Sequence, residues 1–160
     1  MEYIWTPWRM KYIQGNNKTS DCVFCQALTQ LDGSDNLVLF RGQLAFVILN
    51  RYPYTSGHVM VVPMAHKPAL EDLDTDIRTE IIELTTKCIN VLKIVYKPEG
   101  FNLGMNIGAI AGAGIAEHIH MHIVPRWAGD TSFMAILGKT RVLPENLEDT
   151  YLRMLNAWKE

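Results

Sequence analysis

The chain has 160 residues, of which 48% are hydrophobic and 20% are charged, as in an ordinary globular domain and unlike a disordered chain. Fifteen Lys and Arg residues against seventeen Asp and Glu residues give a formal net charge of −2, which excludes a whole-chain polycation that coats nucleic acid. No apolar run approaches the roughly 18 residues of a membrane span, and no signal peptide is visible. We therefore expect a single domain over residues 1–160, with no nucleic-acid or membrane partner.

The first half of the chain predicts a leader, a short helix and three strands. Residues 1–20 form an aromatic-rich leader, and a short helix is expected over Cys22–Leu31. The β-rich runs Leu37–Arg41 and Leu44–Asn50 predict a hairpin, and His58–Pro63 predicts a short buried strand.

A long amphipathic helix follows. Apolar residues recur at spacings of three and four at Leu73, Ile77, Ile81, Leu84, Cys88, Val91 and Val95. Asp72 or Asp74 is a candidate N-cap, and Pro98 and Gly100 lie just past the expected end. Cys88 falls on the apolar stripe, so we interpret it as a core residue.

The remaining elements complete an antiparallel sheet. Alternating residues predict strands over Phe101–Ile107 and Glu117–Val124, separated by the small-residue loop Gly108–Gly114. A C-terminal helix is predicted from the spacing of Leu147, Tyr151, Met154 or Leu155, and Trp158. Strands joined by hairpins around one long helix indicate an α+β fold.

Three of the five histidines lie within five residues. In a strand, alternation sends His118, His120 and His122 to one face and the intervening apolar residues to the other. A strand face that merely meets water would favour Thr, Lys or Glu. Because histidine carries protons near neutral pH and binds metals, the row predicts a catalytic or metal-binding role.

The Gly/Ala-rich segment Asn106–Ala116 comes immediately before this row. Small residues allow backbone N–H groups to approach an anion closely. The position of the loop predicts a phosphate group held over an imidazole.

These motifs resemble the histidine triad (HIT) superfamily of nucleotide hydrolases and transferases. The resemblance covers about Cys22 to Asp130, and it implies a HIT-like core over residues 21–130 with a C-terminal extension over 131–160. It is carried by His118-x-His120-x-His122 with Ile123-Val124-Pro125-Arg126, by Asn50-Arg51-x-Pro53 with Gly57-His58-Val59, and by Asn106-x-Gly108 with Ala111-Gly112. The segments Trp5–Ile13 and Arg126–Phe133 resemble a bacterial branch that includes diadenosine tetraphosphate phosphorylases.

The resemblance implies roles for three histidines. His120 is expected to attack the α-phosphorus of a nucleotide and to form a nucleotidyl-histidine intermediate. His122 is expected to donate to a non-bridging or leaving oxygen. His58 is expected to orient or polarise the triad, and the alternative for His58 is a satisfied buried histidine.

The resemblance also implies substrate contacts. Asn50 is expected to hold the ribose, Asn106 and the backbone of Gly112, Ala113 and Gly114 the phosphate, and apolar side chains near Phe46 the base. Many relatives carry Gln or Ser where this chain has Ala113 and Gly114. A side-chain donor to the leaving group is therefore absent here, or it is replaced by backbone N–H groups.

Three cysteines are too few for a disulfide scaffold, and Cys22 and Cys25 form a Cys-x-x-Cys motif. So few cysteines in a chain without a visible signal peptide predict a reducing, cytoplasmic compartment. In such a compartment the Cys-x-x-Cys motif predicts a metal-binding turn or a redox pair. Some relatives bind zinc through residues that match Cys22, Cys25, His66 and His118, which implies a closed, structural zinc site. A redox pair and a bare Cys-x-x-Cys are the alternatives.

The leading functional hypothesis is phosphorolysis of diadenosine tetraphosphate through a covalent histidine, with an adenine nucleotide or dinucleoside polyphosphate and inorganic phosphate as partners. Hydrolysis of a dinucleoside polyphosphate or a nucleoside phosphoramidate is the alternative reaction, and uridylyl transfer is disfavoured because His122 is intact. A nucleotide-binding adaptor with vestigial activity and a small zinc-binding module are further alternatives. By resemblance we expect a homodimer or homotetramer. The aromatic-rich leader is expected either to contact another subunit or to fold onto its own core.

Overall fold

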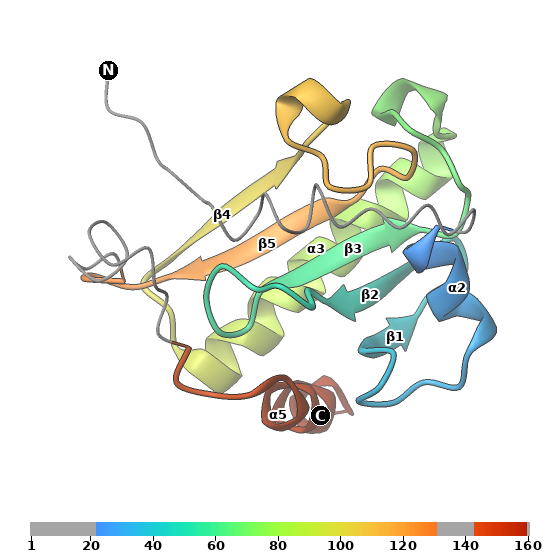
Figure 1. Ribbon diagram of the computed structural model, residues 1–160. Helices are drawn as coiled ribbons and strands as arrows, with labels where there is room; N and C mark the ends of the chain where they lie inside the picture. Colours follow the sequence, from blue (N-terminus) through green and yellow to red (C-terminus); the bar gives the residue numbers. More distant parts are fainter. Residues whose placement is uncertain (1–21, 131–142, 160) are drawn as a thin grey trace, which may run out of the picture.

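The computed structural model describes residues 22–130 and 143–159. Five antiparallel strands form one sheet in the order β1-β2-β3-β5-β4 (Figure 1). The strands are β1 (Val38–Arg41), β2 (Ala45–Leu49), β3 (Val59–Pro63), β4 (Gly100–Met105) and β5 (Met121–Arg126). The predicted leader, residues 1–20, lies outside the described residues.

The helices are distributed around the sheet. The long helix α3 (Thr75–Tyr96) packs on β2, β3 and β5, behind the sheet in the view of Figure 1. The short helix α2 (Val23–Thr29) lies on the side of the sheet nearer the viewer. The C-terminal helix α5 (Leu147–Lys159) packs against α3 and β1. Two short 3-10 helices, η1 (Leu70–Asp72) and η2 (Ala109–Ala111), interrupt the loops.

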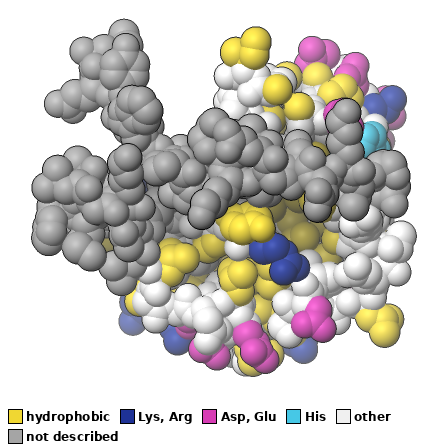
Figure 2. Space-filling model, in the orientation of Figure 1, with side chains coloured by type: hydrophobic (Ala, Val, Ile, Leu, Met, Phe, Trp, Pro, Cys, Tyr) yellow, Lys and Arg dark blue, Asp and Glu magenta, His cyan; other side chains and the backbone are white. Residues whose placement is uncertain are grey.

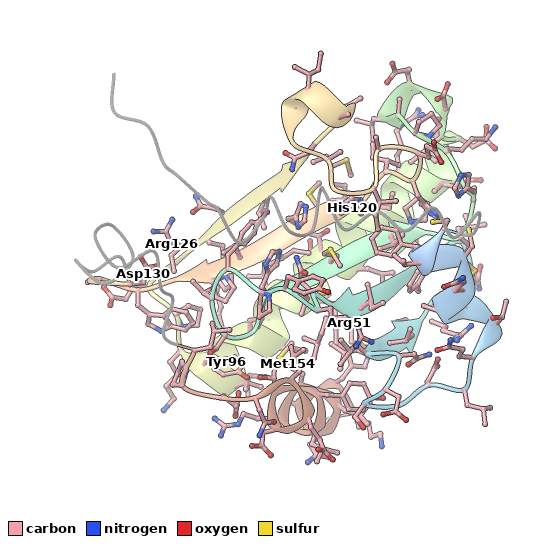
Figure 3. All side chains as sticks on the ribbon, viewed as in Figure 1. Arg51, Tyr96, His120, Arg126, Asp130 and Met154 are labelled. Carbon is pink, nitrogen blue, oxygen red and sulfur yellow. The ribbon has the colours of Figure 1, made fainter. Side chains whose placement is uncertain are left out.

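The α+β fold and its main elements are confirmed. The apolar stripe of α3 is buried at Ile81, Leu84, Cys88 and Val91. The C-terminal helix buries Tyr151, Met154 and Trp158 as its spacing predicts, and Figure 3 labels Met154 on the side of α5 that faces Tyr96. In the part of the chain that is described, no helix has the length and apolarity needed to span a membrane.

The residues at both ends of α3 explain where the helix begins and ends. Asp74 occupies the N-cap position, although its side chain makes no capping hydrogen bond. The helix ends at Lys97, which adopts a left-handed conformation with φ 47° and ψ 51°. Pro98 follows and lacks the N–H that would continue the helix, so the predicted end is confirmed.

The predicted strand over Glu117–Val124 is displaced. Strand β5 begins only at Met121 and runs to Arg126, so His118 and His120 precede the sheet ladder. The segment before Met121 binds the loop after β3 and not a neighbouring strand, because the N–H of Ile119 donates to the carbonyl of Lys67 at 2.7 Å. The histidine row therefore spans a loop and the start of a strand, and not one continuous strand.

Gly57 brings the β2–β3 connection close to α3. Its φ is +78°, and a Cβ atom built there would lie 2.9 Å from Cδ2 of Leu92. Both the backbone conformation and the close approach favour glycine at this position. The next residue is His58, which enters the core 1% exposed.

Candidate active site and metal centre

A cavity of about 370 Å³ opens on the face of the sheet that carries α2. Figure 2 shows hydrophobic side chains gathered in a hollow on this face, with a basic side chain among them. Figure 3, in the same view, labels His120 and Arg51, which both line the cavity. The described residues that line it are Val23, Phe24, Gln26, Ala27, Gln30, Asn36, Leu37, Ile48, Leu49, Asn50, Arg51, Tyr52, Tyr54, Met60, Gly114, Ile115, His120 and His122.

His120 presents one defined nitrogen to the cavity. Its Nδ1 lies 2.9 Å from the backbone carbonyl of His118, and a carbonyl only accepts, so Nδ1 carries the proton. The unshared electron pair is then on Nε2. Burial lowers the pKa of His120, and the hydrogen bond to His118 opposes that shift only in part. A buried, neutral imidazole with a fixed tautomer is suited to nucleophilic attack.

His58 and His122 form a hydrogen-bonded pair beside His120. Nε2 of His58 lies 2.9 Å from Nδ1 of His122, and the ring centroids of His120 and His122 are 4.7 Å apart. The backbone N–H of Tyr54 donates to Nδ1 of His58 at 3.1 Å. The ring of Tyr54 packs on His58 with a centroid distance of 4.6 Å. The structure thus brings the three histidines predicted to be catalytic into one cluster.

The predicted substrate residues are placed unevenly. Asn50 and Gly114 line the cavity, whereas Asn106 does not and instead donates to the carbonyl of Gly112 at 3.4 Å. The N–H groups of Gly112 and Ala113 donate within the loop, to Ala109 and Gly108 respectively. The contact of these two N–H groups with a phosphate stays a prediction, and in this structure both groups bind carbonyls of the η2 turn.

Phe46 is 0% exposed, and Ile48, two residues along the same strand, lines the cavity. The resemblance places the base among apolar side chains near Phe46, and this stays a prediction. Most of the other lining residues were not predicted as site residues, and Phe24 and Tyr54 are among them. Phe24 directly precedes Cys25, and Tyr54 follows the Asn50-Arg51-x-Pro53 motif, so their places in the sequence were the available signal.

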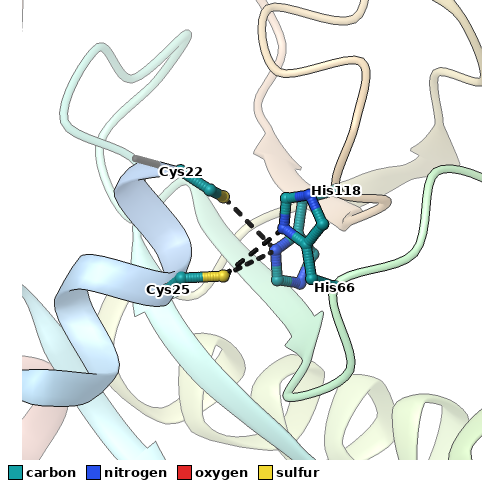
Figure 4. A group of neighbouring side chains, drawn as sticks. All are labelled: Cys22, Cys25, His66 and His118. Carbon is teal, nitrogen blue, oxygen red and sulfur yellow. Dashed lines mark hydrogen bonds between the residues drawn. The ribbon is translucent and has the colours of Figure 1, made fainter. Parts of the chain in front are cut away.

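Cys22, Cys25, His66 and His118 converge beside the cavity, with one ligand atom from each lying within 4.8 Å of the others (Figure 4). Sγ of Cys22 lies 3.3 Å from Nδ1 of His118, and Sγ of Cys25 lies 3.4 Å from Nδ1 of His66. Sulfur and nitrogen ligands of a tetrahedral zinc ion are separated by roughly 3.5 Å, given the usual bond lengths. The donor set and its spacing therefore fit zinc.

The surroundings of His118 favour its role as a ligand. Its Nε2 lies 2.8 Å from the carbonyl of Pro63, which accepts the ring proton and leaves the electron pair of Nδ1 facing the thiols. Burial lowers the pKa of His118. Burial, together with the neighbouring Cys22, raises the pKa of Cys25. Two thiols held this close resist joint ionisation until a cation offsets their charge.

The cavity and the metal cluster share the short helix α2. Phe24, between the two cysteines, lies against the ring of His118 at 5.4 Å and that of His120 at 5.0 Å. With seven residues and no side-chain cap, α2 is too short to be stable without tertiary contacts. Anchoring of Cys22 and Cys25 therefore also fixes one wall of the cavity.

Comparisons with known proteins agree with this geometry. The family model described as the HIT domain matches residues 33–129. The chain is 41% identical to a protein of Mycobacterium tuberculosis named AP-4-A phosphorylase, across 99% of this chain and 85% of that protein. It is 33% identical to the asymmetrical bis(5′-nucleosyl)-tetraphosphatase of Schizosaccharomyces pombe, across 59% of this chain and 52% of that protein.

A solved structure shares the fold. The Zn-bound histidine triad family protein of Mycobacterium smegmatis superposes with a TM-score of 0.70 at 24% identity. The match covers 88% of this chain and 94% of that protein.

Proposed function

The chain belongs to the HIT domain family, and we propose that it transfers an adenylyl group from diadenosine tetraphosphate to inorganic phosphate through a covalent bond to His120. The observation that carries this proposal is the orientation of His120, whose Nδ1–H is bound to His118 so that Nε2 is left for the cavity. The similarity to a phosphorylase over nearly the whole chain supports the choice of reaction.

In the first step, the electron pair of Nε2 attacks the α-phosphorus, and the bond from phosphorus to the bridging oxygen breaks. The electrons of that bond depart with ATP, and His120 becomes a positively charged N-adenylyl imidazole that retains Nδ1–H. The carbonyl of His118 stabilises this charge because it accepts a hydrogen bond from Nδ1.

In the second step, an oxygen of inorganic phosphate attacks the same phosphorus. The N–P bond breaks, its electrons return to Nε2, and ADP leaves. The covalent intermediate divides one displacement into two, so that a single pocket receives both the polyphosphate and the phosphate.

Other cavity residues bind and orient the substrate. We propose that Asn50, which follows β2 and lines the cavity, holds the ribose, and that the lining residues Phe24, Leu37 and Ile48 contact the base. His122 and the backbone of Gly114, which line the same cavity, are proposed to donate to phosphoryl oxygens. The guanidinium of Arg51, fixed by a 2.7 Å bond to the carbonyl of Asp35, adds positive charge for an anionic ligand.

We also propose that the chain binds one structural zinc ion through Cys22, Cys25, His66 and His118. When bound, the zinc would supply a cross-link between α2, the loop after β3 and the segment that precedes β5. We also propose that the protein is cytoplasmic, because three cysteines are too few for a disulfide scaffold and Cys22 and Cys25 are free in this structure.

Self-association through strand β4 is a further part of the proposal. β4 is an edge strand of the described sheet, and its Leu103 side chain is 49% exposed. Light scattering during gel filtration tests this, with a dimer or tetramer expected and a monomer at high protein concentration as the contrary result.

Product analysis tests the reaction. The protein is incubated with diadenosine tetraphosphate in the presence and absence of inorganic phosphate, and the nucleotides are separated. ADP plus ATP, formed only with phosphate, is the expected result. AMP plus ATP regardless of phosphate would identify a hydrolase, and the absence of turnover would contradict the enzymatic proposal.

A further inference from the structure

Helix α2 supplies much of one wall of the cavity. Val23, Phe24, Gln26 and Ala27 of this helix line the cavity, and so does Gln30, which follows its last turn. The helix has seven residues, which is too short for it to be stable without tertiary contacts. The position of this wall therefore depends on the contacts that hold α2 to the rest of the protein.

The C-terminal end of α2 is held by one arginine side chain. Arg41 is the last residue of strand β1. Its Nη1 donates to the carbonyl of Leu28 at 2.8 Å, and its Nη2 donates to the carbonyls of Ala27 at 3.1 Å and Gln30 at 3.0 Å. The last carbonyls of a helix need partners from outside the helix. The guanidinium group supplies such partners and joins the end of α2 to the sheet (Figure 1).

A carboxylate orients this guanidinium group. Nε of Arg41 donates to Oδ1 of Asp32 at 2.9 Å, and Nη2 donates to the same oxygen at 2.6 Å. The two side chains are 30% and 39% exposed, so their opposite charges contribute little stability by themselves. Because the guanidinium group is planar, these two hydrogen bonds fix the direction in which its other N–H groups point.

The same turn is also bound by a buried amide. Asn36 is 6% exposed, and its Nδ2 donates to the carbonyl of Ala27 at 3.2 Å. Its Oδ1 accepts the backbone N–H groups of Gly33 and Val38, each at 3.1 Å. Asn36 lines the cavity, whereas Arg41 is not among the described residues that do so. An effect of Arg41 on a ligand is therefore expected to pass through α2.

The two ends of α2 are tied to different parts of the fold. The N-terminal end carries Cys22 and Cys25, which belong to the proposed zinc site. The C-terminal end is tied by Arg41 to β1, which pairs with β2 through Val38 and Ile48. Strand β2 in turn contributes Ile48 to the lining of the cavity. Arg41 thus connects the helix to the strands that border the same cavity.

We propose that Arg41 is a positioning residue that sets the distance between α2 and strands β1 and β2, and thereby the fit of the nucleotide base. The inference rests on the proposed function, in which the base contacts Phe24, Leu37 and Ile48. Phe24 belongs to α2, whereas Leu37 directly precedes β1 and Ile48 lies in β2. The base therefore contacts residues on both sides of the Arg41 link. The ring of His120 is oriented by the carbonyl of His118, so the chemical step depends less on this link.

Two ligands that differ in the presence of the base test the proposal. The inhibition constants of AMP and ribose 5-phosphate are measured against phosphorolysis of diadenosine tetraphosphate, for the unaltered protein and for Arg41→Met. Methionine keeps an apolar stem but donates no hydrogen bond. We expect the constant of AMP to rise about tenfold, that of ribose 5-phosphate to stay within about threefold, and kcat to stay within about threefold.

The contrary results are distinct. An unchanged constant for AMP, or an equal rise for both ligands, would overturn the inference and leave the proposed function intact. If the unaltered protein shows no turnover, the proposed function fails, and the dissociation constants of the two ligands by calorimetry then test Arg41 in the same way. Absence of AMP binding by the unaltered protein would overturn both proposals.

Three further variants separate geometry from charge. Arg41→Lys keeps the positive charge but lacks the planar fork, so it should recover only part of the affinity for AMP, and full recovery would overturn the geometric role. Asp32→Asn should raise the constant of AMP alone by about two- to threefold, and it carries the same test if Arg41→Met does not fold. Arg153→Met is the matched control, because it removes a 2.9 Å ion pair with Glu145 at α5 and should keep the affinity for AMP. A loss as large as that in Arg41→Met would contradict the role of Arg41.

Amide hydrogen exchange measures the link without any ligand. The amides of α2 should exchange about tenfold faster in Arg41→Met than in the unaltered protein, and in Arg153→Met they should exchange as in the unaltered protein. Unchanged exchange of α2 in a folded Arg41→Met variant would overturn the inference, because the helix would then keep its position without the guanidinium group.

Discussion

The first two histidines of the row, His118 and His120, hold the same kind of ring in opposite tautomers. His118 donates its Nε2–H to Pro63 and turns Nδ1 toward Cys22. Two residues later, His120 donates its Nδ1–H to His118 and leaves Nε2 for the cavity. Because a carbonyl only accepts, the position of the nearest carbonyl decides which nitrogen keeps its electron pair. In the proposed account, the local backbone thus separates a metal ligand, His118, from a nucleophile, His120.

The largest expected effect falls on the cavity end of this comparison. His120→Ala removes the nucleophile, so phosphorolysis of diadenosine tetraphosphate should fall by about 10⁴-fold or more. Its zinc content and circular dichroism should match those of the unaltered protein, because Nδ1 of His118 is untouched. Activity within tenfold of the unaltered protein would eliminate the covalent mechanism.

The next largest loss of activity is expected at His58, which is hydrogen-bonded to His122 of the row. His58→Ala removes the donor to Nδ1 of His122, and turnover should fall about 10²-fold. His58→Gln places an amide N–H near the same position and should recover part of that loss. The two variants are compared by kcat at saturating substrate. Equal activities for Ala and Gln would show that His58 only fills space.

Loss of a proposed zinc ligand should weaken nucleotide binding more than it slows the chemical step. Cys25→Ser should reduce zinc to below roughly a tenth of an equivalent per chain and lower the melting temperature. Because α2 forms one wall of the cavity, the Kd for AMP by calorimetry should rise about tenfold, which corresponds to about 1.4 kcal/mol. Cys88→Ala is the matched control and should keep its zinc. Full zinc occupancy in Cys25→Ser would refute the ligand assignment.

The smallest expected effect is a difference in reactivity between the three cysteine thiols. Burial raises the pKa of Cys88 to about 12, so its thiolate is scarce at pH 8. Alkylation after chelator treatment should therefore label Cys22 and Cys25 and leave Cys88 unmodified, as peptide mass mapping would show. Rapid labelling of Cys88 in the folded protein would indicate that the core packing is wrong.

The sequence predicted the elements because their periodicity is strong. The stripe of α3 places apolar residues on one face, whereas β2 and β3 are continuous apolar runs whose residues are buried throughout. The predicted start of β5 was wrong because the N–H of Ile119 donates to the carbonyl of Lys67. The two residues are 52 positions apart in the chain, so no local sequence pattern encodes this hydrogen bond.

The site was predictable in its residue types but not in its proton positions. The family resemblance selected Cys22, Cys25, His66 and His118, and the structure brings them together. By contrast, composition does not reveal which N–H groups a turn binds, as at Gly112 and Ala113, whose N–H groups donate within the η2 turn. The tautomers of His58, His120 and His122 depend on backbone groups, so they required the fold.

Trapping of the intermediate tests the central claim most directly. The protein is mixed with diadenosine tetraphosphate without phosphate, quenched in alkali, digested and analysed by mass spectrometry. We predict one adenylyl group on the peptide that contains His120, attached to that residue and lost when phosphate is added before the quench. An adduct on another residue, or turnover to ADP and ATP with no adduct at any time, would contradict the account.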